Sequence, residues 1–97
     1  MELINFKANS YNGQYEGTES GFLVKGNVSA DSQKHITNIS GSAIESNQPV
    51  VNFSAYGNGQ GLSYNFNDIR DFTKFAQAIP AIQAAVAAVQ EEISALE

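Results

Sequence analysis

The amino-acid sequence predicts an α+β fold, an antiparallel β-meander of about five strands followed by a long C-terminal α-helix. Up to residue 66, apolar and polar residues alternate with a period of two, which is typical of strands with one buried face. Gly and Asn interrupt this alternation where hairpin turns are expected. Beyond residue 67 there is no glycine and alanine becomes frequent, which favours a helix. We therefore expect a single domain over residues 1–97, with the meander at 1–66 and the helix at 68–96.

Turn residues separate the expected strands. Asn12-Gly13 suits a type I′ turn, because both central positions of that turn need positive φ. The glycine-rich segment 57–61 predicts a second hairpin. Gly17 and Gly21 interrupt a long alternating run, and we interpret them as a bend or bulge within one strand. The strands are expected at residues 4–8, 14–30, 35–44, 51–56 and 62–66.

The third expected strand has an ambiguous register. Ile36 and Ile39 lie three positions apart, an odd spacing, so a regular strand would place them on opposite faces. Either a bulge shifts the register between them, or both faces of this strand are partly covered.

The helix is expected to begin after Asn67, whose side chain is a good N-cap. Asp68 and Asp71 then lie in or near the first turn, where negative charge is favourable to the helix dipole. Pro80 has no backbone N–H to donate, so it either kinks the helix or splits it into two.

The larger apolar residues of the helical segment form a heptad seam. Their spacing alternates between three and four, the period at which helices wind around each other. The seam comprises Phe72, Phe75, Ile79, Ile82, Val86, Val89, Ile93 and Leu96. Its first half packs either on the chain's own sheet or on another helix, because any amphipathic helix has such a stripe. A straight helix of this length spans about 45 Å, and five strands span only roughly 20 Å, so we expect the second half to overhang the sheet.

We predict that the overhanging half packs against a second copy of the chain, with a dimer favoured. The predicted interface residues are Ile79, Ile82, Val86, Val89, Ile93 and Leu96. Alanines surround the seam and permit close contact between helices. The positions beside the seam lack paired charges, so parallel and antiparallel arrangements both stay open.

Composition argues against several classes of function. The formal net charge is −5 and the five basic residues are scattered, so neither nucleic acid nor an anionic membrane surface is expected as a partner. Cysteine is absent, which removes disulfides and thiolate sites. The N-terminus does not resemble a signal peptide, and the weakly polar stretch 78–89 is too short to span a bilayer. We expect a cytoplasmic protein, with export left open.

The sequence shows no recognisable catalytic, metal-binding or phosphate-binding motif. His35 is the single histidine, with Asp31 near it in sequence, but a solvent-facing histidine beside a turn is far more often inert. One histidine without cysteine also argues against a zinc site. Segment 57–61 lacks the Lys-Ser/Thr ending of a phosphate-binding loop. We predict no catalytic residue, metal or cofactor, and we expect that the protein is not an enzyme.

Tyrosines give a second hypothesis. Tyr11, Tyr15 and Tyr56 lie among Asn and Gln, and exposed tyrosines in such surroundings bind sugars or flat ligands by stacking and hydrogen bonding. The simpler interpretation is that tyrosine favours strands. The leading hypothesis is a non-enzymatic structural or protein-interaction module that self-associates through its C-terminal helix. The alternative is a small-molecule or carbohydrate-binding module that uses exposed Tyr and Asn on the sheet.

Overall fold

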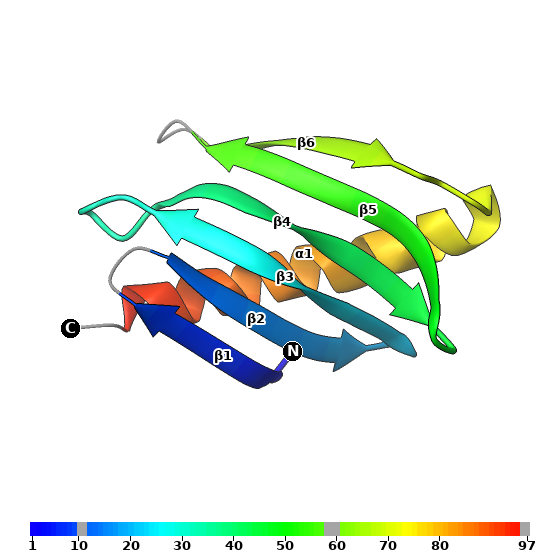
Figure 1. Ribbon diagram of the computed structural model, residues 1–97, viewed down its shortest axis with the longest axis horizontal. Coiled ribbons are helices and arrows are strands. Elements are labelled where there is room, and N and C mark those ends of the chain that lie inside the picture. Colours follow the sequence, from blue (N-terminus) through cyan, green and yellow to red (C-terminus); the bar gives the residue numbers. More distant parts are fainter. Residues whose placement is uncertain (10–11, 58–60, 96–97) are drawn as a thin grey trace.

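The computed structural model describes residues 1–9, 12–57 and 61–95, which form a six-stranded sheet with one helix packed on it. Neighbouring strands are antiparallel, and the order of the strands in the sheet is their order in the chain (Figure 1). The elements are β1 (Leu3–Asn9), β2 (Asn12–Glu19), β3 (Phe22–Ala30), β4 (Ile36–Glu45), β5 (Gln48–Gly57), β6 (Leu62–Asn67) and α1 (Phe72–Ser94). The predicted fold class, an antiparallel meander followed by a C-terminal helix, is confirmed.

The sheet has six strands because a hairpin divides the long run expected at residues 14–30. Ser20 and Gly21 both have positive φ, 55° and 85°, as a two-residue type I′ turn requires. Glu19 pairs with Phe22 across this turn, so β2 and β3 are separate strands. The interpretation of Gly21 as a bend within one strand was wrong.

Asn12-Gly13, the first expected turn, is part of a strand. Asn12 and Gly13 belong to β2 and pair with residues of β1, so they do not form the hairpin turn that their sequence suggests. A Cβ atom at residue 13 would lie 2.7 Å from the carbonyl oxygen of Lys7, so glycine permits the close approach of the two strands here. The hairpin expected at 57–61 falls largely outside the described residues.

A bulge resolves the register of β4. Ser29 pairs with Asn38, but the next residue, Ala30, pairs with Ile36, so β4 holds one extra residue at this point. Because of this shift, Ile36 and Ile39 are both buried, at 6% and 0% exposure. The alternative in which a bulge shifts the register is therefore the one that the structure adopts.

α1 begins later than the sequence suggests. Asp71 is its N-cap, and the Asp71 Oδ1 atom accepts a hydrogen bond of 3.1 Å from the backbone N–H of Lys74. Asn67, the expected N-cap, is the last residue of β6. The helix then continues through Pro80 without a break. Pro80 and Ala76 are both exposed, so water can reach the Ala76 carbonyl that lacks its usual donor.

One face of the sheet packs against α1 and is called the helix face; the other is called the open face. α1 crosses the helix face obliquely and lies across β1 to β5 (Figure 1). The largest fully buried side chains of this core are Val24, Ile39, Val51, Ile82 and Val89. Burial of each such side chain stabilises the fold by about 1.5–3 kcal/mol relative to leaving it exposed.

Tyr15 crosses the middle of the helix face. It lies beside Gly26, which in turn pairs with Gly41, and its hydroxyl donates a hydrogen bond of 3.0 Å to the carbonyl oxygen of Ser40. A Cβ atom at Gly41 would lie 2.6 Å from the Tyr15 hydroxyl oxygen, so glycine at position 41 leaves the space that the hydroxyl end of Tyr15 occupies. Tyr15 is consequently only 2% exposed.

Candidate interaction surface at the β6 edge

The edge strand β6 carries an apolar face that α1 does not cover. Leu62, Tyr64 and Phe66 point to the helix face, because Tyr64 and Phe66 pair with the buried Ala55 and Phe53 of β5. α1 lies across β1 to β5, so β6 extends the sheet beyond the helix. Tyr64 accordingly keeps 37% of its surface exposed, and Leu62 and Phe66 are only partly buried.

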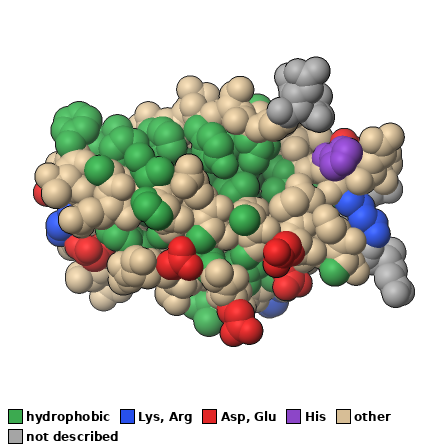
Figure 2. Space-filling model, turned by 180° about the vertical axis from the view of Figure 1, so that it is seen from behind, with side chains coloured by type: hydrophobic (Ala, Val, Ile, Leu, Met, Phe, Trp, Pro, Cys, Tyr) green, Lys and Arg blue, Asp and Glu red, His purple; other side chains and the backbone are tan. Residues whose placement is uncertain are grey.

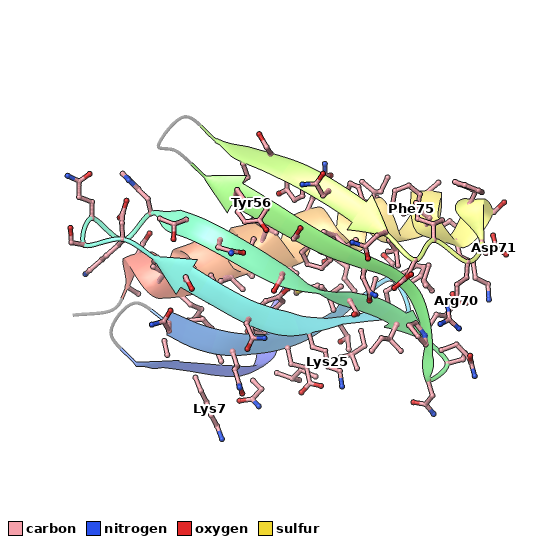
Figure 3. All side chains as sticks on the ribbon, turned by 45° about the horizontal axis from the view of Figure 1, so that its top comes forward. Lys7, Lys25, Tyr56, Arg70, Asp71 and Phe75 are labelled. Carbon is pink, nitrogen blue, oxygen red and sulfur yellow. The ribbon has the colours of Figure 1, made fainter. Side chains whose placement is uncertain are left out.

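Aromatic rings connect this strand to the start of α1. The rings of Tyr64 and Phe66 are stacked, with centroids 6.0 Å apart and planes 4° from parallel. Phe75 of α1 meets Phe66 edge to face at 5.0 Å (Figure 3 labels Phe75). Burial beside these neighbours raises the pKa of Tyr64 above its ordinary value.

The first turns of α1 continue the same apolar surface. Phe72 is 75% exposed, the largest exposed fraction of any large hydrophobic side chain that the structure describes, and Ile79 is partly buried. We call Leu62, Tyr64, Phe66, Phe72 and Ile79 together the apolar strip. Figure 2 shows hydrophobic side chains gathered along this part of the helix face, while the acidic side chains lie elsewhere. The strip itself contains no charged residue.

A groove of about 300 Å³ adjoins the strip at Leu62. It lies between the strand ends and the second half of α1, and Leu62, Val86 and Ala87 supply its apolar wall. Gln90 closes one side, since its side-chain amide donates to the Lys34 carbonyl oxygen at 2.9 Å and its Oε1 accepts from a backbone N–H of β4 at 3.3 Å. The groove therefore lengthens the uncovered apolar surface beside α1.

The sheet of the same chain covers most of the predicted interface residues. Ile82, Val86, Val89 and Ile93 are at most 8% exposed. The expectation that the second half of the helix overhangs the sheet is therefore wrong: only the first turns of α1, residues 72–77, are largely exposed. Ile79 is partly buried and belongs to the apolar strip, and Leu96 lies outside the described residues.

The three candidate tyrosines do not form one surface. Tyr15 lies beneath α1, and burial raises its pKa well above the ordinary value. Tyr56 is 54% exposed and lies on the open face (Figure 3). Tyr11 lies outside the described residues. Ligand binding by an exposed tyrosine is thus a prediction for Tyr56 and not for Tyr15.

The open face is polar almost throughout. Its cross-strand rows consist mainly of Ser, Asn and Gln, such as Gln14, Asn27, Ser40, Ser54 and Asn65 on β2 to β6. A shallow depression of about 430 Å³ lies on this face, with Asn5, Gln14, Glu16, Lys25, Asn27 and Ser42 around it. Lys7, Lys25 and Tyr56 are labelled on β1, β3 and β5 in Figure 3.

Asp31 lies beside His35 and holds the turn that precedes β4. Asp31 Oδ1 accepts hydrogen bonds of 2.9 Å from the backbone N–H groups of Gln33 and His35, which hold the turn before β4 and lower the pKa of Asp31. The His35 ring lies 3.9 Å from the Asp31 carboxylate, and both side chains are substantially exposed. Within the described ranges, no three His, Cys, Asp or Glu side chains are grouped so that they could hold a metal ion.

Comparison with protein-family models, with curated protein sequences and with solved structures finds no match to this chain. α1 is long and apolar enough to pass a length and composition test for a membrane span, which core helices of soluble proteins pass as well. The buried apolar residues of α1 pack against the sheet and form part of the hydrophobic core.

The sequence carries a pattern that predicts part of the strip. The alternation of Leu62, Tyr64 and Phe66 predicts an apolar strand face, and the last strand of a meander is an edge strand. Joining these two facts identifies an apolar edge. Whether α1 covers that edge depends on its crossing direction, which periodicity does not give.

Proposed function

We propose that this chain is a non-enzymatic interaction module that self-associates through the apolar strip, which α1 and β6 form together. The observation that carries this proposal is an uncovered, uncharged apolar surface along an unpaired sheet edge. In this proposal α1 still takes part in self-association. The contact residues, however, are Phe72 and Ile79 of α1 together with β6, and not the buried residues of the seam.

Charge supports a second copy as the partner. The chain carries a net charge of −5, so two copies repel each other unless their contact surfaces are free of acidic residues. The side chains of the strip are all apolar, and the exposed carboxylates nearest to it in the chain, Asp68 and Asp71, lie at one end, after β6 and before Phe72. Exposed aromatic side chains such as Phe72 and Tyr64 are also typical anchors of protein interfaces.

The test is molar mass in solution. We expect light scattering after size-exclusion chromatography to give a dimer for the unchanged chain across a concentration series. Phe72→Glu places a carboxylate in the strip, and we expect it to give a monomer because the charge loses its water on association. Phe72 is mostly exposed, so the fold tolerates this change.

Thr18→Glu is the matched control. Thr18 is exposed on β2, away from the strip, and the substitution alters the net charge by the same amount. It should keep the mass of the unchanged chain. A monomer for the unchanged chain at every concentration, or a dimer that survives Phe72→Glu, would contradict the proposal.

The open face supports a second candidate function, carbohydrate binding. Amide, hydroxyl, carboxylate and ammonium groups surround the depression of about 430 Å³, and sugars bind through such mixed donors and acceptors. Tyr56, exposed on the same face, offers a ring for stacking. A glycan array probed with the unchanged chain and with Tyr56→Ala tests this function. The idea fails if no glycan binds or if every signal survives the substitution.

A further inference from the structure

β6 is a sheet edge without the usual protection against strand pairing. Its pairing with β5 is regular from Gly57↔Leu62 to Asn52↔Asn67, with no bulge. Its sequence, LSYNFN, contains neither a charged residue nor proline. Natural edges are commonly blocked by charges, proline, bulges or a covering element, and β6 shows none of these among the described residues.

We infer that the second copy adds its own β6 antiparallel to this β6, so that the two six-stranded sheets continue as one. This inference rests on the proposed self-association and specifies its geometry. The outward backbone N–H and C=O groups of the two strands then bond to each other, and the two apolar strips become neighbours on one face.

The alternation of β6 restricts the register of this pairing. Directly opposed residues of antiparallel strands point to the same face, so apolar residues must oppose apolar residues. Among the registers that satisfy this condition, two give the longest overlap of the strands, five residues of each β6: Tyr64 opposite Tyr64 of the second copy, or Tyr64 opposite Phe66 of the second copy. Both place Ser63 and Asn65 of the two copies together on the open face. A shift by one residue would mix the apolar and polar faces.

Symmetry and the position of Asp68 favour antiparallel pairing of β6 with the β6 of a second copy. Identical strands paired this way satisfy a two-fold axis, the commonest symmetry of protein dimers. Asp68 follows β6 directly, and it is exposed and accepts a hydrogen bond of 2.8 Å from Asn52. Antiparallel pairing places the two Asp68 carboxylates at opposite ends of the contact, whereas parallel pairing would place them side by side.

The competing geometry is face-to-face stacking of the two apolar strips. In that arrangement the open faces point away from each other, so residues on the open face of β6 are far apart. Asn65 is exposed and lies on the open face, which makes it the position that separates the two geometries.

The experiment uses single cysteine variants, because the chain has no cysteine of its own. Asn65→Cys is treated with a thiol-reactive cross-linker that spans about 8 Å, the reach of diagonal neighbours across paired strands. Asn5→Cys is the control, since Asn5 is exposed on the other edge strand. We expect covalent dimers of Asn65→Cys and only background cross-linking of Asn5→Cys. Both variants are compared with the unchanged chain by light scattering.

The outcomes distinguish this inference from the proposed function. If the variants are dimers by mass but Asn65→Cys does not cross-link, edge pairing is wrong while self-association stands. Cross-linking of Phe72→Cys in the same dimer would then point to stacked strips. If the chain is a monomer at every concentration, the proposed function fails, and this inference fails with it.

Discussion

The two edge strands of the sheet, β1 and β6, differ in the features that prevent an edge from pairing with another chain. β1 has the exposed Lys7, a register shift between Leu3 and Asn5, and contact with α1 along the helix face. β6 is uncharged and regularly paired, and it lies beyond the helix. By the rules that govern edge strands, β1 is protected from pairing with other chains and β6 is not.

The difference arises from the direction in which the helix crosses the sheet. A helix of 23 residues is about 35 Å long, more than the roughly 24 Å between the outer strands of a six-stranded sheet. Length is therefore sufficient for complete coverage. Because α1 crosses obliquely, however, part of its length runs along the strands, and the corner at β6 stays uncovered (Figure 1). A single helix on a wide sheet leaves one corner available for a partner.

The covered and uncovered parts of the heptad seam should respond very differently to truncation. Ile82 is 1% exposed beneath the sheet, so Ile82→Ala should lower the free energy of unfolding by about 2–5 kcal/mol through lost burial and a cavity. Phe72→Ala should change it by less than about 0.5 kcal/mol, because Phe72 is mostly exposed. Urea unfolding at a low protein concentration, where association does not contribute, measures both. Equal losses would mean that α1 does not lie on the sheet in this way.

One lysine substitution on each edge strand tests whether the dimer forms through β6 or through β1. Tyr64→Lys places two ammonium groups near each other across paired β6 strands, and we expect it to weaken the dimer by about 1 kcal/mol, roughly fivefold in dissociation constant. Ile4→Lys adds the same charge to β1, where Ile4 is 64% exposed, and should leave the dimer unchanged. Sedimentation equilibrium gives both constants. A larger effect of Ile4→Lys would transfer the contact to the β1 edge.

The parts of the fold that depend on local periodicity could be predicted from sequence. The alternation in residues 62–66 and the seam of α1 gave the strand and the helix, and the meander followed from the short turns. The Ser20-Gly21 turn was missed because serine rarely adopts positive φ, so only Gly21 carried a signal. The N-cap was misplaced because Asn67 and Asp71 are both good caps, and only pairing of β6 with β5 decides between them.

The candidate site depended on information that periodicity lacks. The seam has the same spacing whether it faces the chain's own sheet or a second helix, so the sequence alone did not show that Ile82 and Val89 are buried. The burial of Tyr15 likewise depends on Gly41, which lies two strands away and leaves space for the Tyr15 hydroxyl. Such long-range contacts are set by register and crossing direction.

Tyr15 and Tyr64 provide the finest comparison between the covered and uncovered parts of the helix face. Tyr15→Phe removes the hydrogen bond to the Ser40 carbonyl oxygen and should lower the free energy of unfolding by about 1 kcal/mol at pH 7. Tyr64→Phe should leave the stability of the monomer nearly unchanged, because Tyr64 is more than a third exposed.

The two substitutions should also differ in alkaline solution. Burial raises the pKa of Tyr15 in the folded state, so the unfolded chain ionises first once the pH passes the ordinary tyrosine value of about 10. The contribution of Tyr15 is therefore fully present below that pH and is lost as the pH rises toward the folded pKa. Tyr15→Phe should lose less stability between pH 9 and pH 11 than the unchanged chain does, which urea unfolding at each pH measures. An identical alkaline loss in both chains would show that the Tyr15 hydroxyl is not buried as the structure has it.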